Sequence, residues 1–193
     1  MCRTPILVPL LSLAVLVIQG CAAAVVGGTA TTAMIVVDPR TAGTILDDEM
    51  IEFKVREAFY DQPELSKQSH LNVTSYNGKV LLTGEAISQT IRQRIEALAR
   101  AVPKVRGVHN EIIIAAPSSA LTRSSDSWIT AKVTSRLAAS DEVKSVDIKV
   151  VTENGTVYLM GLVSRENASK ATDVVRQTSG VQRVVKLFEY TNG

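Results

Sequence analysis

NGKVLLTG at residues 77–84 returns as NGTVYLMG at residues 154–161. In both copies apolar residues alternate after the Asn-Gly pair, and the same alternation precedes it at residues 71–73 and 148–150. Alternation with a period of two is typical of β-strands, and Asn-Gly tolerates the positive φ angles of a two-residue type I′ turn. Each copy therefore predicts a β-hairpin that turns at Asn-Gly.

The similarity between the copies extends in both directions along the chain. The pattern D-x-x-I-x-x-K-V occurs at residues 48–55 and again at residues 126–133. The pattern V-x-x-V occurs at residues 105–108 and again at residues 181–184. Self-similarity in this order indicates two copies of one small domain.

Each copy is predicted to open with an amphipathic helix. Apolar residues recur every four positions after both aspartates, which is the pattern of a helix that buries one face. They are Ile51, Val55 and Phe59 in the first copy and Ile129, Val133 and Leu137 in the second. Asp48 and Asp126 are predicted to be the N-caps of these helices.

A second helix and a third strand complete each copy. The helices are expected near residues 91–102 and from Ser164, a predicted N-cap, to Thr178, and the strands at residues 107–114 and 184–190. A right-handed crossover would bring the third strand beside the second. We therefore expect an α+β fold of two tandem αββαβ domains, each a three-stranded mixed sheet covered by two helices. The sequence leaves open whether the two domains pack on one another.

The chain is expected to divide into five parts, because small and turn-forming residues set off the repeated units. They are a signal peptide at residues 1–20, a lipidated flexible tether at 21–47, a first domain at 48–115, a linker at 116–125 and a second domain at 126–193. The alternative for the apolar residues at 34–37 is a short packed strand.

The first residues resemble a lipoprotein signal. An apolar run from Ile6 to Ile18 follows the basic Arg3 and ends in Gln19-Gly20-Cys21. Cys21 is therefore the predicted lipid attachment site, where each buried methylene of an acyl chain contributes about 0.8 kcal/mol to membrane binding. The alternative, an ordinary secretory signal, is disfavoured because its cleavage site favours A-x-A. Ala22 after the cysteine, instead of aspartate, favours the outer membrane.

Composition and motifs argue against several functions. Lys and Arg number 21 against 19 Asp and Glu, so the basic excess of a nucleic-acid-binding protein is missing. His70 and His109 have no neighbours at metal-ligand spacing, and the sequence contains no nucleophile elbow or P-loop. We therefore expect no enzymatic activity, no metal, no cofactor and no nucleic-acid partner.

The repeated unit resembles the BON domain in its αββαβ order, its N-G hairpins and its V-x-x-V before the last strand. With the Cys21 signal and the small-residue tether, the chain resembles the dual BON-domain outer-membrane lipoproteins of Gram-negative bacteria, the DolP type. The resemblance covers nearly the whole chain and is most specific from Asp126 to Gly161. It implies a periplasm-facing lipoprotein that binds anionic phospholipid, phosphatidylglycerol or cardiolipin, through the first helix of its second BON domain. It further implies support of outer-membrane integrity, enriched at the division site.

The first helices of the two copies differ along one stripe. The stripe is Met50, Lys54 and Ala58 in the first copy and Trp128, Lys132 and Arg136 in the second. Indole is favoured at a membrane interface, and each basic residue near an anionic surface contributes about 1 kcal/mol. The phospholipid-binding residues are predicted to be Trp128, Thr130, Lys132, Arg136 and Leu137. The alternative is that Trp128 is a core or interdomain residue.

Two hypotheses about function follow. The first is an anchored lipid-binding module that uses Trp128 and its neighbouring cations. The second is a non-enzymatic adaptor or structural protein that contacts outer-membrane assembly proteins through a sheet edge or a helix groove. The exposure of Trp128 distinguishes the two, because a buried indole cannot reach lipid.

Overall fold

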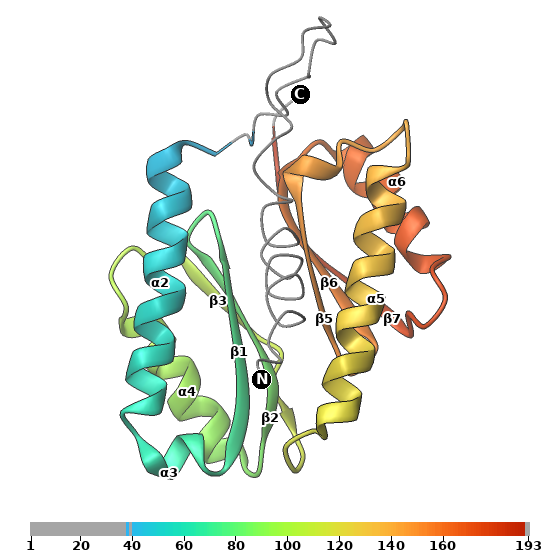
Figure 1. The fold of residues 1–193 in the computed structure, drawn as a ribbon. Helices are drawn as coiled ribbons and strands as arrows, with labels where there is room; N and C mark the ends of the chain where they lie inside the picture. The colour runs from blue at the N-terminus through green and yellow to red at the C-terminus, as the bar shows by residue number, and fades with distance from the viewer. Residues whose placement is uncertain (1–37, 39, 192–193) are drawn as a thin grey trace, which may run out of the picture. The chain divides into compact units, whose positions relative to one another are not determined.

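The computed structural model describes residue 38 and residues 40–191 (Figure 1). The predicted signal peptide, Cys21 and the first part of the predicted tether lie outside these residues. The described chain contains the αββαβ order twice, which confirms the predicted α+β fold of two tandem units. We call residues 42–114 the first repeat and residues 120–190 the second repeat.

The elements of the first repeat are α2 Ala42–Tyr60, α3 Pro63–Ser66, β1 Ser69–Tyr76, β2 Lys79–Ala86, α4 Gln89–Ala101, β3 Gly107–Asn110 and β4 Ile113–Ile114. Those of the second repeat are α5 Ala120–Ala138, the 3-10 turn η1 Ser145–Asp147, β5 Ile148–Glu153, β6 Thr156–Val163, α6 Arg165–Arg176 and β7 Arg183–Tyr190.

Both predicted hairpins are present. β1 pairs antiparallel with β2, and β5 with β6. The φ angles at the turns are 52° at Asn77, 72° at Gly78, 48° at Asn154 and 70° at Gly155. Positive φ at both central residues is the geometry that twists a two-residue turn to match the twist of its strands. The third strand of each repeat then adds parallel to the second, after the crossover helix.

The third strand of the first repeat is interrupted, although the sequence predicted one strand over residues 107–114. β3 and β4 both pair with β2, but they are separated at residues 111–112. The Asn110 carbonyl accepts a hydrogen bond from Arg92 of α4 (2.8 Å), and the Asn110 side chain accepts one from the Ile112 N–H (3.3 Å). These bonds let the chain turn so that Ile112 enters the core, where it is 2% exposed. In the second repeat β7 is continuous.

The first helix of each repeat starts earlier than predicted. Thr41 caps α2 and Ser119 caps α5, since their hydroxyls accept hydrogen bonds from the N–H groups three residues later (3.1 and 3.2 Å). The prediction that Asp48 and Asp126 are the N-caps is therefore wrong. Ser164, by contrast, is the N-cap of α6 as predicted.

Asp48 and Asp126 instead link each first helix to its hairpin. Both lie inside their helices and are 3% and 6% exposed. Each carboxylate accepts hydrogen bonds from both N–H groups of its Asn-Gly turn, at 2.7–2.9 Å. The turns leave these N–H groups without strand partners, so the aspartates satisfy donors that would otherwise be buried and unpaired.

The residues just before α2 belong to the folded repeat. The Arg40 guanidinium forms ion pairs with Asp38 (2.7 Å) and Asp48 (2.8 Å), and it lies over the ring of Tyr76 at 4.0 Å from its centroid. The hydrogen bond from Arg40 holds the pKa of the Asp38 carboxyl below its usual value. The part of the predicted tether from Arg40 onward is therefore ordered against the first repeat.

Each repeat has its own core beneath its helices. The predicted apolar stripes of both first helices lie in these cores, with the side chains of β1, β2 and α4 in one and those of β5, β6 and α6 in the other. A third cluster joins the repeats through Tyr76 and Leu81 of one sheet and Tyr158 and Met160 of the other. The sequence left open whether the two repeats pack on one another. They do, because the two sheets meet by the faces that their helices do not cover (Figure 1).

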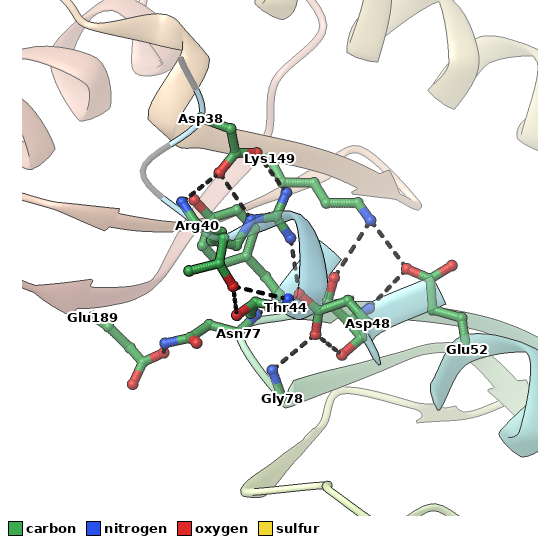
Figure 2. A network of polar contacts seen from close by, with 12 residues as sticks. Asp38, Arg40, Thr44, Asp48, Glu52, Asn77, Gly78, Lys149 and Glu189 are labelled. Carbon is green, nitrogen blue, oxygen red and sulfur yellow. Dashed lines mark hydrogen bonds and ion pairs between the residues drawn. The ribbon is translucent and has the colours of Figure 1, made fainter. Parts of the chain in front are cut away.

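Polar side chains surround this sheet–sheet contact. Three of the hydrogen bonds there join a donor of one repeat to a carboxylate of the other. These pairs are Lys149 to Glu52 (3.0 Å), Asn154 to Glu85 (2.7 Å) and Asn77 to Glu189 (2.9 Å). Figure 2 shows Lys149 reaching Glu52 beside the Asp48 and Arg40 contacts. Residues 69 to 112 positions apart thus fix the mutual orientation of the repeats.

Glu153→Gln is expected to stabilise the protein more at pH 8 than at pH 4. Glu153 is buried at the contact, where its carboxylate accepts a hydrogen bond from Asn72 of the first repeat (2.7 Å). Burial raises the pKa of Glu153, and the nearby Glu85 acts in the same direction. The folded state therefore holds a proton that the unfolded state has lost, and stability falls as the pH rises above the ordinary glutamate value.

Urea unfolding of wild type and Glu153→Gln at pH 4 and pH 8 measures this effect. The variant removes the titration and keeps an amide oxygen that can accept from Asn72. A stability difference between the two proteins that does not grow from pH 4 to pH 8 would contradict the assignment.

Candidate functional site

Trp128 lies on the outer face of α5, away from both cores. Its side chain is 67% exposed, although it is the only tryptophan of the chain. The alternative that Trp128 is a core or interdomain residue is therefore wrong. An exposed indole is costly to keep in water and is characteristic of surfaces that meet a partner or a membrane interface.

The two cations of the predicted stripe lie one and two turns further along the same helix. Lys132 Nζ donates to the carbonyl oxygen of Ser179 (2.6 Å) and to its hydroxyl (3.2 Å). Arg136 donates to the carbonyl oxygen of Gln177 (2.9 Å). These bonds fix where the two positive charges lie but leave them un-neutralised, since neither side chain is in an ion pair within the part of the chain that the structure describes.

A shallow groove of about 290 Å³ lies beside these side chains. It is lined by Trp128, Ala131, Lys132, Ser135, Arg136, Thr178 and Ser179. One wall is α5, and the other is the turn that follows α6. Gly180 makes this turn possible, because it adopts φ 95° and a side chain there would press against Ile129 of α5. The groove therefore combines apolar surface, hydroxyl groups and two positive charges.

The remaining predicted site residues lie elsewhere. Thr130 is half-buried and donates to the hydroxyl of Thr152 on β5 (2.8 Å), on the side of α5 that faces its sheet. Leu137 is 1% exposed and belongs to the core of the second repeat. Including Leu137 among lipid-facing residues was wrong, because its position continues the buried stripe of Ile129 and Val133. Cys21 lies outside the described residues.

Thr178 and Ser179 were not among the predicted site residues. They follow α6, about 50 residues after Trp128 in the sequence, and nothing in their local pattern marks them. The matched stripe of the first repeat carries different side chains. Met50 is 45% exposed there, and Ala58 stands where the second repeat has Arg136.

Other site types find little support among the described residues. No group of three His, Cys, Asp or Glu side chains there could hold a metal ion. His109 lies half-buried on β3, where burial lowers its pKa. No described helix is both long enough and apolar enough to cross a membrane.

Comparison with known proteins identifies related chains. The BON domain profile matches residues 47–116 and 125–192. The chain is 41% identical over 187 residues to the outer membrane lipoprotein DolP of Haemophilus influenzae, covering 94% of this chain and 97% of that one. It is 40% identical over 154 residues to the 21 kDa hemolysin of Actinobacillus pleuropneumoniae, covering 80% and 79%. It is 28% identical over 145 residues to the osmotically-inducible protein Y of Escherichia coli, covering 74% and 72%.

Proposed function

Since the chain belongs to the BON domain family, as a dual BON-domain lipoprotein of the DolP type, we propose that it binds anionic phospholipid through the groove beside Trp128. In this proposal acyl chains on Cys21 hold the protein on the periplasmic side of the outer membrane. The second repeat then lays α5 on the membrane surface. The protein is a binding module and not an enzyme.

The exposure of Trp128 beside two un-neutralised cations is the observation that carries the proposal. The indole can insert among lipid head groups while its N–H keeps a polar partner. Lys132 and Arg136 attract the phosphates of an anionic surface by about 1 kcal/mol each. The Ser135 and Ser179 hydroxyls on the groove wall can donate hydrogen bonds to phosphate or glycerol oxygens.

The acyl anchor makes such a weak surface contact sufficient. A contact worth a few kcal/mol corresponds to millimolar affinity for a free protein. An anchored protein meets the same surface at a high effective concentration, so a weak contact is occupied much of the time. Support of outer-membrane integrity and enrichment at the division septum are further parts of this proposal.

Lys132→Gln/Arg136→Gln is expected to reduce binding to anionic vesicles by about tenfold or more, from the loss of two surface charges. The measurement is flotation of the chain from residue 21 with Cys21→Ser, so that no acyl chain contributes. Vesicles of phosphatidylethanolamine with and without phosphatidylglycerol separate the electrostatic part. Trp128→Ala is expected to weaken binding to both kinds of vesicle.

Lys54→Gln, at the position of the first repeat that matches Lys132, is the control and should float like the parent chain. All three positions are solvent-accessible, so the folds should be preserved. Equal flotation of the double variant and the parent on anionic vesicles would overturn the proposal. It would leave the adaptor hypothesis, with outer-membrane assembly proteins as the partners to examine.

A further inference from the structure

Helix α2 of the first repeat has an apolar stripe on its outer face in addition to the one in the core. Leu46 is 64% exposed, Met50 45%, Phe53 56% and Tyr60 64%. We call these four residues the α2 ridge. No described element packs against this side of α2 (Figure 1). Exposed apolar surface of this extent on one helix face marks a site of interaction.

The ridge follows the spacing of a coiled-coil seam. Residues 46, 50, 53, 57 and 60 alternate steps of four and three, which places them on one narrow line along a helix. Gly43 continues the same line towards the start of α2. The matching positions of α5 are Ser124, Trp128, Ala131, Ser135 and Ala138. The seam is therefore particular to the first repeat and does not result from the shared fold.

The charges beside the ridge make a lipid partner unsuitable. Three carboxylates, Asp47, Glu49 and Glu57, lie on this side of α2, against two cations, Lys54 and Arg56, so this face carries a net negative charge. An anionic membrane surface would repel this face, whereas the stripe of α5 carries two cations. The occupant of the ridge is therefore a protein surface.

We propose that the α2 ridge is the place where two copies of this chain pair, with their α2 helices antiparallel about a two-fold axis. In this register Met50 of each copy lies opposite Phe53 of the other. Tyr60 lies opposite Gly43, which is exposed and offers room for the ring because its nearest neighbour to an added Cβ is 3.8 Å away. The same register places Leu46 opposite the methylenes of Glu57, so Met50, Phe53 and Tyr60 make the apolar contacts at the centre and the ends of the seam.

The charges that flank the seam agree with the antiparallel arrangement. Lys54 of one copy lies opposite Asp47 of the other, and Glu49 lies opposite Arg56. The two-fold axis repeats each of these two pairs, and all four contacts join a positive side chain to a negative one. A parallel arrangement would instead bring the two copies of Glu57 face to face at the seam, which is unfavourable.

Within one chain, half of these charges already have partners. Asp47 pairs with Lys104 (2.6 Å) and Arg56 with Glu52 (3.3 Å). Lys54 and Glu49 form no ion pair with any described residue. Each cross-pair would therefore give Lys54 or Glu49 an ion-pair partner. The Asp47 carboxylate and the Arg56 guanidinium can each form a second ion pair.

Pairing of two single helices buries less surface than the roughly 1,200 Å² of a stable interface, so the dimer should be weak in dilute solution. Confinement of both copies to one membrane would raise their effective concentration. This inference uses the anchoring part of the proposed function, but it does not involve the groove beside Trp128. The lipid-binding proposal and the dimer proposal are therefore tested by different assays.

Chemical crosslinking of the full-length acylated protein in phosphatidylethanolamine proteoliposomes tests the dimer. Phe53→Lys places a charge in the seam and is expected to lower the crosslinked dimer by about tenfold, as the loss of an apolar contact worth over 1 kcal/mol implies. Phe53 is exposed, so the fold should be unaffected. Leu121→Lys, at an 81% exposed apolar residue of α5, is the matched control and should leave the dimer unchanged.

A charge exchange identifies the register. Asp47→Lys and Lys54→Glu should each lose the dimer when present alone, because each homodimer then has like charges opposite one another. Mixed in one membrane, the two variants should recover it as a heterodimer, because both cross-pairs again join opposite signs. The Asp47–Lys104 pair that is lost is largely exposed, so its removal should hardly affect stability.

Recovery on mixing would establish antiparallel pairing through the α2 ridge. Absence of a wild-type dimer at high membrane density, or a dimer that Phe53→Lys does not weaken, would overturn the proposal. Crosslinking of the ridge in cells to a different envelope protein and not to a second copy would also overturn it. If flotation on anionic vesicles fails while the dimer persists, only the lipid proposal is lost.

Discussion

Gly84→Ala is expected to destabilise the protein by about 3–5 kcal/mol, the cost of a backbone clash that the structure cannot relax. A Cβ at Gly84 would overlap the carbonyl oxygen of His70 on the neighbouring strand. His70 pairs with Glu85 in the antiparallel ladder, so its backbone cannot move away without breaking the sheet. Gly84 also adopts φ 117°, which L-residues disfavour.

Gly161→Ala should have a similar effect in the second repeat. Its Cβ would overlap the carbonyl oxygen of Asp147, at the turn that leads into β5. Here φ is unexceptional, so the clash acts alone and the loss should be somewhat smaller than at Gly84. The repetition of this close approach explains why a glycine ends the NGKVLLTG pattern in both copies.

Gly43→Ala is the control, because a Cβ there meets only the Thr41 hydroxyl at 3.8 Å. Alanine is the better helix former by about 1 kcal/mol, so this variant should be slightly stabilised. Urea unfolding curves of the three variants give the comparison. A Gly84→Ala protein within 1 kcal/mol of wild type would show that the strands are less closely paired than the structure indicates.

Asp126→Ala is expected to cost about 3–5 kcal/mol, because one buried and one half-buried N–H group would lose the carboxylate that satisfies them. These are the N–H groups of Asn154 and Gly155, each 2.9 Å from an oxygen of Asp126. Their hydrogen exchange should accelerate as the hairpin turn loosens. The helix itself should remain, since Ser119 and not Asp126 caps it.

Asp48→Ala should be more damaging than Asp126→Ala. Asp48 also accepts from the hydroxyl of Ser75 (2.6 Å) and pairs with Arg40 (2.8 Å), contacts that Asp126 lacks. Asp173→Ala on the exposed face of α6 is the control and should change stability by less than about 0.5 kcal/mol. Equal stabilities of the Asp126→Ala and Asp173→Ala proteins would refute the turn-linking role.

Local patterns predicted the secondary structure well because they describe interactions between near neighbours. The Asn-Gly turns, the alternation of Val80 and Leu82, and the four-residue spacing of Ile129 and Val133 each follow from backbone geometry over a few residues. The N-caps were misplaced for the same reason. An aspartate before an apolar run has the local signature of a cap, and its true partners lie about 30 residues away in the hairpin turn.

The candidate site was predictable in part. Trp128, Lys132 and Arg136 share a helix face by their spacing alone, and the structure places all three on the outer side of α5. The groove between them was not predictable, because its second wall is the turn at Thr178 and Ser179. Leu137 was misassigned, since a residue one position from an exposed stripe can belong to the buried one.

Periodicity and turn chemistry are therefore enough to specify two αββαβ units, because the spacing of apolar residues over a few positions identifies the buried face of a strand or helix. The pairing of the units required the folded chain. Tyr76, Leu81, Tyr158 and Met160 look in sequence like residues of an open sheet face, and they become a core only where the two sheets meet. Contact between segments nearly 80 residues apart depends on the shapes of both finished surfaces, and no short stretch of sequence encodes those shapes.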